Sequence, residues 1–177
     1  MKVLLGITGG IAAYKACDII SGLRATNHEV KVIVTKNALN FITELTLSSL
    51  SGNKVTTTMW QETHGDIEHI SNAQWADVLL IAPCTANMIA KLNYGIADDC
   101  LSTVALALGD KTKKIIAPAM NTNMWLSEPV THNIDILASL DWIIIPPIKG
   151  KLACGDMGTG KLAKPRTIVE RVNELIN

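Results

Sequence analysis

Three polar residues of this chain stand in segments where they could do chemistry. Cys154 lies in the glycine-rich segment LACGDMGTGK, where a thiol is not expected to fill a core, because glycine-rich loops are mobile and exposed. A mobile loop could carry such a thiol over a site as an acid or a nucleophile. His69, in EHISNAQWAD, has the side chain that titrates near neutral pH. Asn121, in PAMNTNMW, offers an uncharged donor and acceptor that could orient a carboxylate.

Each of these residues also has a structural interpretation. A lone histidine is more often structural than catalytic, and an asparagine after a strand is a common turn residue. The other cysteines, Cys17, Cys84 and Cys100, are far apart in the sequence and form no C-x-x-C pair. We therefore expect them to be small buried side chains, and we expect neither a metal site nor a disulfide framework.

The junction of the first predicted strand and helix favours an anion site. Gly9 and Gly10 follow the apolar run 2–8 and precede a helical pattern, so bare amide groups meet a helix N-terminus there. The chain has neither the G-x-G-x-x-G spacing of a dinucleotide site nor a G-K-[ST] sequence, and Thr35-Lys36-Asn37 ends the second strand without an acid. These features favour a mononucleotide with a terminal phosphate, for which FMN is one candidate. The alternative is a tight turn that binds nothing.

The elements that must position these residues alternate along the chain. Strands are expected at 2–8, 29–35, 54–58, 78–83, 113–120 and 141–147, and helices at 11–26, 37–50, 85–95, 97–109, 127–140 and 165–177. The strands are apolar almost throughout, which is typical of a parallel sheet covered on both faces. We predict an α/β fold, a Rossmann-like doubly wound parallel sheet flanked by helices, in a single domain of residues 1–177 with a glycine-rich loop at about 148–162.

Ligands of such folds bind beyond the carboxyl ends of the strands. The fourth predicted strand runs into APCTAN (82–87) and the fifth into APAMN (117–121). Both segments place small residues before an amide, and a flat ligand could lie against their backbone.

Composition excludes several classes of protein. Of the 177 residues, 48% are apolar and 18% are charged, which is not the composition of a disordered chain. Sixteen basic residues balance sixteen acidic ones, so no basic surplus exists for general nucleic-acid binding. No apolar run approaches the roughly 18 residues of a membrane-spanning helix, and no signal peptide is visible. We expect a cytoplasmic protein without nucleic-acid or membrane partners.

Five segments in order resemble the homo-oligomeric flavin-containing Cys decarboxylases. They are GITGGIAAYKA, HISNAQWAD, APCTANMIAKLNYGIADD, PAMNTNMW and LACGDMGTGKLA, and PAMNTNMW fits the family pattern P-x-M-N-x-x-M-W in full. The resemblance runs from residue 2 to about 162. It implies FMN as cofactor and a homo-oligomer, commonly a trimer or a dodecamer built from trimers. Because the chain ends at Asn177, it resembles the stand-alone form of the family and not the fusion with a ligase domain.

The resemblance also implies roles for individual residues. His69 matches the active-site histidine of the family, Asn121 the asparagine thought to hold the substrate carboxylate, and Cys154 the cysteine of the substrate-recognition loop. The positions that match the cofactor-binding segments are Gly9, Gly10, Ile11, Thr35, Thr85, Ala86, Asn87, Met88, Ser102 and Ala119.

The activity that the resemblance implies is FMN-dependent decarboxylation of 4′-phospho-N-pantothenoyl-L-cysteine to 4′-phosphopantetheine in coenzyme A biosynthesis. The flavin would oxidise the cysteine thiol, CO2 would leave, and the enethiol would be reduced again, with Cys154 as the acid of the last step. One alternative is the oxidative decarboxylase of a peptide C-terminal cysteine, whose loop lacks this cysteine. The other is a non-enzymatic FMN-binding regulatory subunit, which predicts loss of His69, Asn121 or Cys154, yet all three are present.

Overall fold

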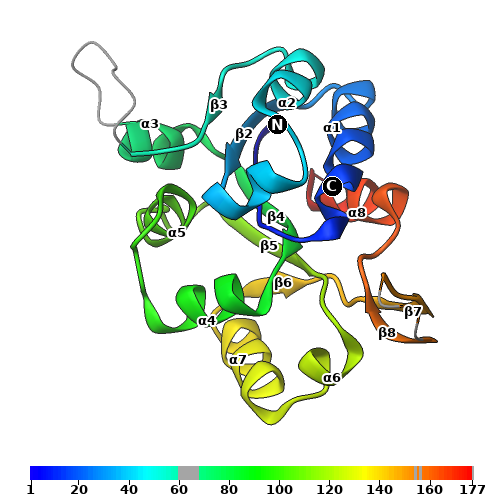
Figure 1. Ribbon diagram of the computed structural model, residues 1–177. Helices are drawn as coiled ribbons and strands as arrows, with labels where there is room; N and C mark the ends of the chain where they lie inside the picture. Colours follow the sequence, from blue (N-terminus) through cyan, green and yellow to red (C-terminus); the bar gives the residue numbers. More distant parts are fainter. Residues whose placement is uncertain (60–67, 154, 156, 177) are drawn as a thin grey trace.

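The computed structural model describes residues 1–59, 68–153, 155 and 157–176. At its centre is a six-stranded sheet in the order β3-β2-β1-β4-β5-β6, in which every pair of neighbours is parallel (Figure 1). The order reverses beside β1, so the topological switch point lies between β1 and β4. The predicted doubly wound parallel sheet is confirmed. The strands are β1 (Lys2–Ile7), β2 (Glu29–Val34), β3 (Val55–Thr56), β4 (Val78–Cys84), β5 (Lys113–Pro118) and β6 (Trp142–Ile144).

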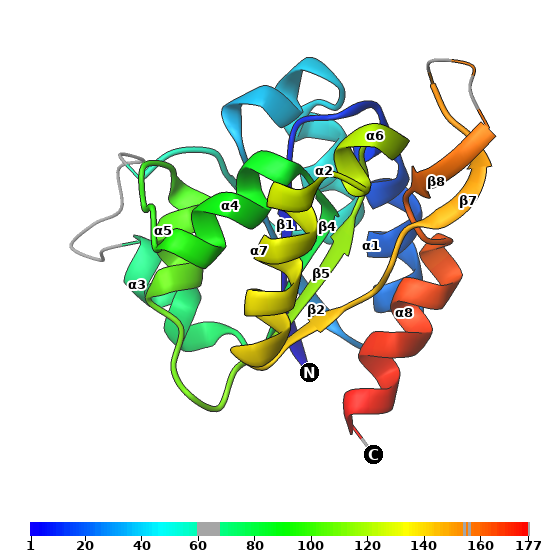
Figure 2. The same cartoon turned by 90° about the horizontal axis from the view of Figure 1, so that it is seen from below.

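Helices cover both faces of this sheet (Figures 1 and 2). One face packs against α1 (Ala16–Ala25), α2 (Glu44–Ser51) and α8 (Pro165–Asn173), and the other against α3 (Glu68–Trp75), α4 (Ala86–Tyr94), α5 (Cys100–Leu106) and α7 (Glu128–Ser139). The remaining short helices are η1 (Ile11–Lys15), η2 (Lys36–Asn40), α6 (Thr122–Trp125) and η3 (Glu174–Ile176). Because both faces are covered, alternate residues of one strand enter different cores: Val3 and Leu5 face α1, while Leu4 faces the opposite layer.

Several parts of the chain differ from the sequence-based expectation, among them the segment 148–162 and the helix α3. The segment 148–162, expected to be a glycine-rich loop, contains an antiparallel hairpin of β7 (Ile148–Lys151) and β8 (Met157–Lys161), which stands outside the main sheet beside α6. The glycines at 158 and 160 are buried, and they are explained by close backbone approach and not by mobility. The helix α3 was not expected, because its sequence is polar and its first turn carries little apolar signal.

The three described cysteines have free thiols, and Cys84 and Cys100 are buried as expected, while Cys17 is half-buried. Burial raises the pKa of the Cys84 thiol, so it stays protonated and acts as a small apolar side chain. Among the described helices, none is long and apolar enough to cross a membrane.

The tight contact between β1 and α5 predicts a specific cost for adding one methyl group. A Cβ on Gly6 would lie 2.6 Å from one methyl carbon of Leu101, which is fully buried. We expect Gly6→Ala to lower the free energy of unfolding by about 1–3 kcal/mol through overpacking, measured from urea unfolding curves. The matched control is Gly10→Ala, whose Cβ would meet nothing within 4 Å and which we expect to change stability by at most about 0.5 kcal/mol. Equal unfolding midpoints for the two variants would contradict this account of the core.

Candidate functional site

The first loop forms an open backbone cradle at the carboxyl edge of the sheet. Gly9 packs so closely on the next loop that a Cβ there would lie 2.5 Å from the Cβ of Asn37, whereas a Cβ on Gly10 would meet nothing within 4 Å. Within the described residues, no acceptor engages the amide groups of Gly9, Gly10 or Ile11. Thr35 makes no capping bond with its side chain, so its hydroxyl also remains available beside this loop. The cradle suits the phosphate of a nucleotide.

The Thr8 side chain joins this cradle to the loop that follows β4. Its hydroxyl donates to the Pro83 carbonyl oxygen at 2.8 Å and accepts from the Thr85 amide at 3.0 Å. Thr8 is only 2% exposed, so both bonds are shielded from water. The two sides of the switch point are therefore held in one fixed relation.

The loop after β4 leads directly into α4. Thr85 is the N-cap of α4, where its hydroxyl accepts from the Met88 amide at 3.3 Å. Ala86 is half-buried and Asn87 is exposed, whereas the Met88 side chain lies in the core. Ala119 adjoins this loop, because its amide donates to the Cys84 carbonyl oxygen at 3.1 Å. Thus the cofactor residues predicted on three separate segments line the same edge of the sheet.

Asn121 lies at the start of α6, and the hairpin β7–β8 packs against the same turn. The Asn121 side-chain oxygen accepts from the Asn123 amide at 2.8 Å. The Met120 amide donates to the Gly160 carbonyl oxygen at 2.9 Å, and Gly158 lies so close to Thr122 that a Cβ would be 2.1 Å from its hydroxyl. The hairpin is thus tied to the Asn121 turn. Cys154 lies outside the described residues, so its position relative to Asn121 is not part of the structure.

The structure does not bring His69 together with Asn121. His69 is half-buried in the first turn of α3, and both views place α3 and α6 on different sides of the molecule (Figures 1 and 2). Ser102 also lies apart from the cradle, on α5. Its hydroxyl belongs to a capping box with Asp99, whose carboxylate accepts from the Ser102 amide at 2.9 Å. Of the predicted site residues in the described part of the chain, these two are the ones separated from the carboxyl-edge cluster.

Positive charge is concentrated beside the cradle. Burial, together with the nearby Lys161 ammonium, lowers the pKa of Lys15 at the end of η1. Two lysines that repel one another in this way attract an anion, because an anion between them would relieve the repulsion.

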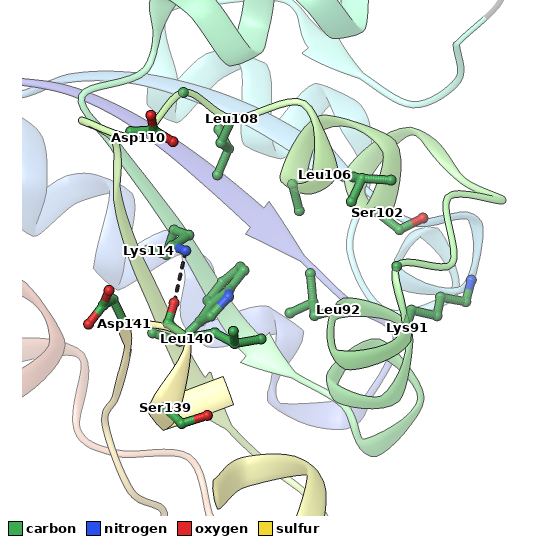
Figure 3. Close-up of a pocket in the computed structure, with 14 residues that line it drawn as sticks. Lys91, Leu92, Ser102, Leu106, Leu108, Asp110, Lys114, Ser139, Leu140 and Asp141 are labelled. Carbon is green, nitrogen blue, oxygen red and sulfur yellow. Dashed lines mark hydrogen bonds between the residues drawn. The ribbon is translucent and has the colours of Figure 1, made fainter. Parts of the chain in front are cut away.

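A cavity of about 390 Å³ lies elsewhere, between α4, α5 and the starts of β5 and β6 (Figure 3). Lys91 lines it and forms ion pairs with Asp98 at 2.5 Å and Asp99 at 2.6 Å. Burial opposes the charge of Lys91, but hydrogen bonds with both carboxylates outweigh it and raise the pKa of the ammonium group. Lys114, on the other side of the cavity, donates to the Leu140 carbonyl oxygen at 2.9 Å. These lysines are already engaged within the fold, and of the predicted cofactor residues only Ser102 lines this cavity.

A protein-family model described as Flavoprotein matches residues 1–177 of this chain. This chain belongs to the flavoprotein family.

Named relatives and solved structures agree with this membership. The chain is 45% identical over 171 residues to the coenzyme A biosynthesis bifunctional protein CoaBC of Bacillus subtilis, covering 96% of this chain and 41% of that protein. It is 41% identical over 174 residues to a Streptococcus mutans protein named "probable phosphopantothenoylcysteine decarboxylase", covering 98% of this chain and 97% of that one. The chain spans about two fifths of the length of the first bifunctional relatives.

Two solved structures share the fold over almost the whole chain. A PPC decarboxylase mutant with one cysteine changed to serine, complexed with pantothenoylaminoethenethiol, has a TM-score of 0.88 and 34% identity, covering 99% of this chain and 97% of that one. The FMN-binding protein AtHal3 has a TM-score of 0.83 and 34% identity, covering 98% of this chain and 95% of that one.

Sequence reasoning missed several residues that organise the candidate site and its surroundings. Thr8 stands between Ile7 and Gly9 and has no signal of its own, because its role depends on contacts with Pro83 and Thr85, 75 and 77 residues away. Asp99 lies apart from the cradle and caps α5, and its spacing of three residues before Ser102 is a helix N-cap signal that the sequence does contain. Gly158 and Gly160 carried a signal as glycines, but their partners in the Asn121 turn could not be read from the sequence.

Two substitutions of Thr8 distinguish the contribution of its hydroxyl group to stability from that of its side-chain size. Thr8→Val keeps the size of the side chain but leaves the Thr85 amide without its acceptor, so we expect a loss of about 1–3 kcal/mol in the free energy of unfolding. Thr8→Ser retains the hydroxyl, and its loss should be clearly smaller. Urea unfolding of both variants measures the difference. A valine variant as stable as the serine variant would mean that the hydroxyl does not hold the two loops together.

Proposed function

We propose that this chain is an FMN-dependent decarboxylase that converts 4′-phospho-N-pantothenoyl-L-cysteine to 4′-phosphopantetheine in coenzyme A biosynthesis. The observation that carries the proposal is the similarity to the Streptococcus mutans protein, which extends over almost the entire length of both chains. That protein is named for the decarboxylation of phosphopantothenoylcysteine. The bifunctional relative is named for coenzyme A biosynthesis, and the PPC decarboxylase structure is similar over 99% of this chain. We place the activity in the cytoplasm, which suits the free thiols of the described cysteines.

The residues at the carboxyl edge fit FMN. Open amides at Gly9, Gly10 and Ile11 suit its phosphate, with the Thr35 hydroxyl beside them and the paired charges of Lys15 and Lys161 nearby. The small residues Ala86 and Ala119 and the backbone around Thr85 leave a surface on which a flat ring can lie. We propose that Asn87 and the backbone of Met88 complete the binding set within one copy. Ser102 lies apart on α5, where its amide and hydroxyl bond to Asp99, so we propose that it joins the set from another copy of the chain.

Each chemical residue has a task that suits its type. When bound, FMN supplies the two-electron oxidation of the cysteinyl part of the substrate and returns the electrons after CO2 has left. Asn121 orients the leaving carboxylate through its amide without neutralising it. His69 holds a proton near the reacting end of the substrate, and Cys154 protonates the carbon that the returned electrons reduce. The bond from the Met120 amide to the Gly160 carbonyl oxygen ties β8 to the Asn121 turn, which supports the proposal that Cys154 and Asn121 act in one site.

A homo-oligomer resolves the separation of His69 from Asn121. We propose a trimer, or a dodecamer built from trimers, in which His69 of one copy completes the site of the next. Large apolar side chains are exposed around the carboxyl edge and on the neighbouring helices, as expected for surfaces that become interfaces. They include Ile11, Tyr14, Phe41, Leu45, Met124 and Leu126.

The thiol of Cys154 should decide whether 4′-phosphopantetheine or the oxidised enethiol is the product. The Cys154→Ser variant should bind FMN and release CO2 but form little 4′-phosphopantetheine, because serine is a much weaker acid than cysteine. We expect the oxidised enethiol to accumulate, as measured by mass spectrometry after incubation with 4′-phospho-N-pantothenoyl-L-cysteine. The complex of a cysteine-to-serine PPC decarboxylase with an enethiol supports this expectation. Unchanged formation of 4′-phosphopantetheine would remove Cys154 from the mechanism.

The wild-type protein is the control for this assay and tests the function itself. It should be yellow, with a flavin absorption spectrum, and should convert the phosphorylated substrate without a net oxidant. Turnover of a peptide with a C-terminal cysteine but not of this substrate would favour the peptide decarboxylase. FMN binding without any decarboxylation would favour the regulatory subunit.

Replacing His69 should separate chemistry from cofactor binding. We expect His69→Asn to retain FMN and its oligomeric state but to lose decarboxylation, because asparagine can occupy a similar space and cannot hold a proton near neutral pH. CO2 release and the flavin spectrum measure the two properties separately. A normal rate of CO2 release would make His69 a structural residue.

A further inference from the structure

A buried polar network ties the first turn of α3 to the edge strand β3. The Thr56 hydroxyl donates to Glu68 Oε1 at 2.6 Å, and the Asn72 side-chain amide donates to Thr56 Oγ1 at 3.4 Å. Thr56 and Asn72 are each only 5% exposed. Since Glu68 and Asn72 are one helical turn apart, a single hydroxyl holds both ends of the turn that carries His69.

The two halves of α3 are held by different forces. The second half is anchored by apolar contacts, because Ala73 and Ala76 lie in the core and Trp75 stacks under the Lys31 ammonium, 4.5 Å from the ring centre. In the first turn, Ile70 and Ser71 are exposed and His69 is only half-buried. The position of the first turn therefore depends on the polar network more than on the core.

The network is not the arrangement that stability alone would select. Glu68 Oε2 is buried and has no hydrogen-bond partner among the residues that the structure describes, although Oε1 accepts the short bond from Thr56. A buried carboxylate oxygen without a donor costs free energy that an apolar side chain would avoid. The Glu68 carboxylate also influences Cys100 at the start of α5. Burial, together with the nearby Glu68 and Asp99 carboxylates, raises the pKa of Cys100 to about 12. The Glu68 carboxylate is explained if its bond to Thr56 serves to orient the first turn of α3.

We propose that Thr56, Glu68 and Asn72 are positioning residues, which fix the first turn of α3 so that the His69 imidazole is held in its reactive orientation. They act through the backbone and touch neither substrate nor FMN. The inference rests on the role that the proposed function gives to His69. It adds a set of three residues that support this histidine from the inner face of the helix.

The test removes the hydroxyl at position 56 and then restores it, in the FMN-loaded oligomer. We expect Thr56→Val to lower kcat for 4′-phospho-N-pantothenoyl-L-cysteine by roughly tenfold to a hundredfold, since a small displacement of a reacting group has an effect of that size. KM and FMN content should stay within about twofold of wild type, because the substrate and cofactor contacts are made elsewhere. Thr56→Ser, which keeps the donor, should recover most of the lost kcat.

A matched control comes from the same turn. The Ser71 hydroxyl donates to the Glu68 carbonyl oxygen at 3.1 Å on the exposed side of α3, and we expect Ser71→Ala to have the wild-type kcat. If the valine variant does not fold, Thr56→Ala and Thr56→Ser form a second pair in which both side chains are smaller than threonine and only one has a hydroxyl.

The outcomes distinguish this inference from the proposed function. If His69→Asn abolishes CO2 release and Thr56→Val leaves kcat unchanged, the positioning role is overturned while the function stands. If His69→Asn has a normal rate, the role of His69 and the positioning role fail together. Equal losses in the valine and serine variants would also overturn the inference, because the hydroxyl would then not be the group that acts.

Discussion

The fold places its site by one buried hydroxyl at the switch point of the sheet. The strands β1 and β4 are neighbours whose connections run in opposite directions, so their carboxyl ends diverge and leave an opening. Thr8 donates across this opening to Pro83 and accepts from Thr85, which sets the distance between the Gly9 cradle and the N-terminus of α4. A phosphate and a flat ring that belong to one ligand need these two surfaces at a fixed separation. The two bonds of Thr8 therefore hold together the two surfaces that we propose for the phosphate and the ring of FMN.

The sheet was predictable because its signal is local. The runs that form β1 and β4 are apolar on both faces after their first residues, and β2 is so from Val32 on, which is the pattern of strands buried between two helical layers. The errors lie where the signal is not local. The strand β3 has two residues in place of the expected five, because it lies at the edge and pairs with β2 alone. The helix α3 is polar because its first turn is held by hydrogen bonds to Thr56 and not by apolar contacts.

The sequence predicts which residues would form the candidate site, but it does not predict which of them lie together in one chain. The residues at 9–11, 85–87 and 119–121 come together because parallel strands bring their carboxyl ends to one edge, a rule that holds without knowing the contacts. His69 follows no such rule: it lies on α3, which packs on one face of the sheet, and Figures 1 and 2 place α3 and α6 on different sides of the molecule. In the homo-oligomer that we propose, His69 and Asn121 of one site come from different copies, and sequence spacing carries no information on which copy supplies a residue.

The hairpin changes how the glycine-rich segment should be understood. Glycines were expected there to provide mobility, yet Gly158 and Gly160 are buried where any side chain would collide with Thr122 or with the Met120 carbonyl oxygen. Gly160 also has a φ of +156°, which few other residues adopt. These glycines fix the base of the hairpin to the Asn121 turn, since the bond from the Met120 amide requires that approach. The strand β8 is therefore fixed relative to the Asn121 turn, and its two glycines serve close packing rather than flexibility.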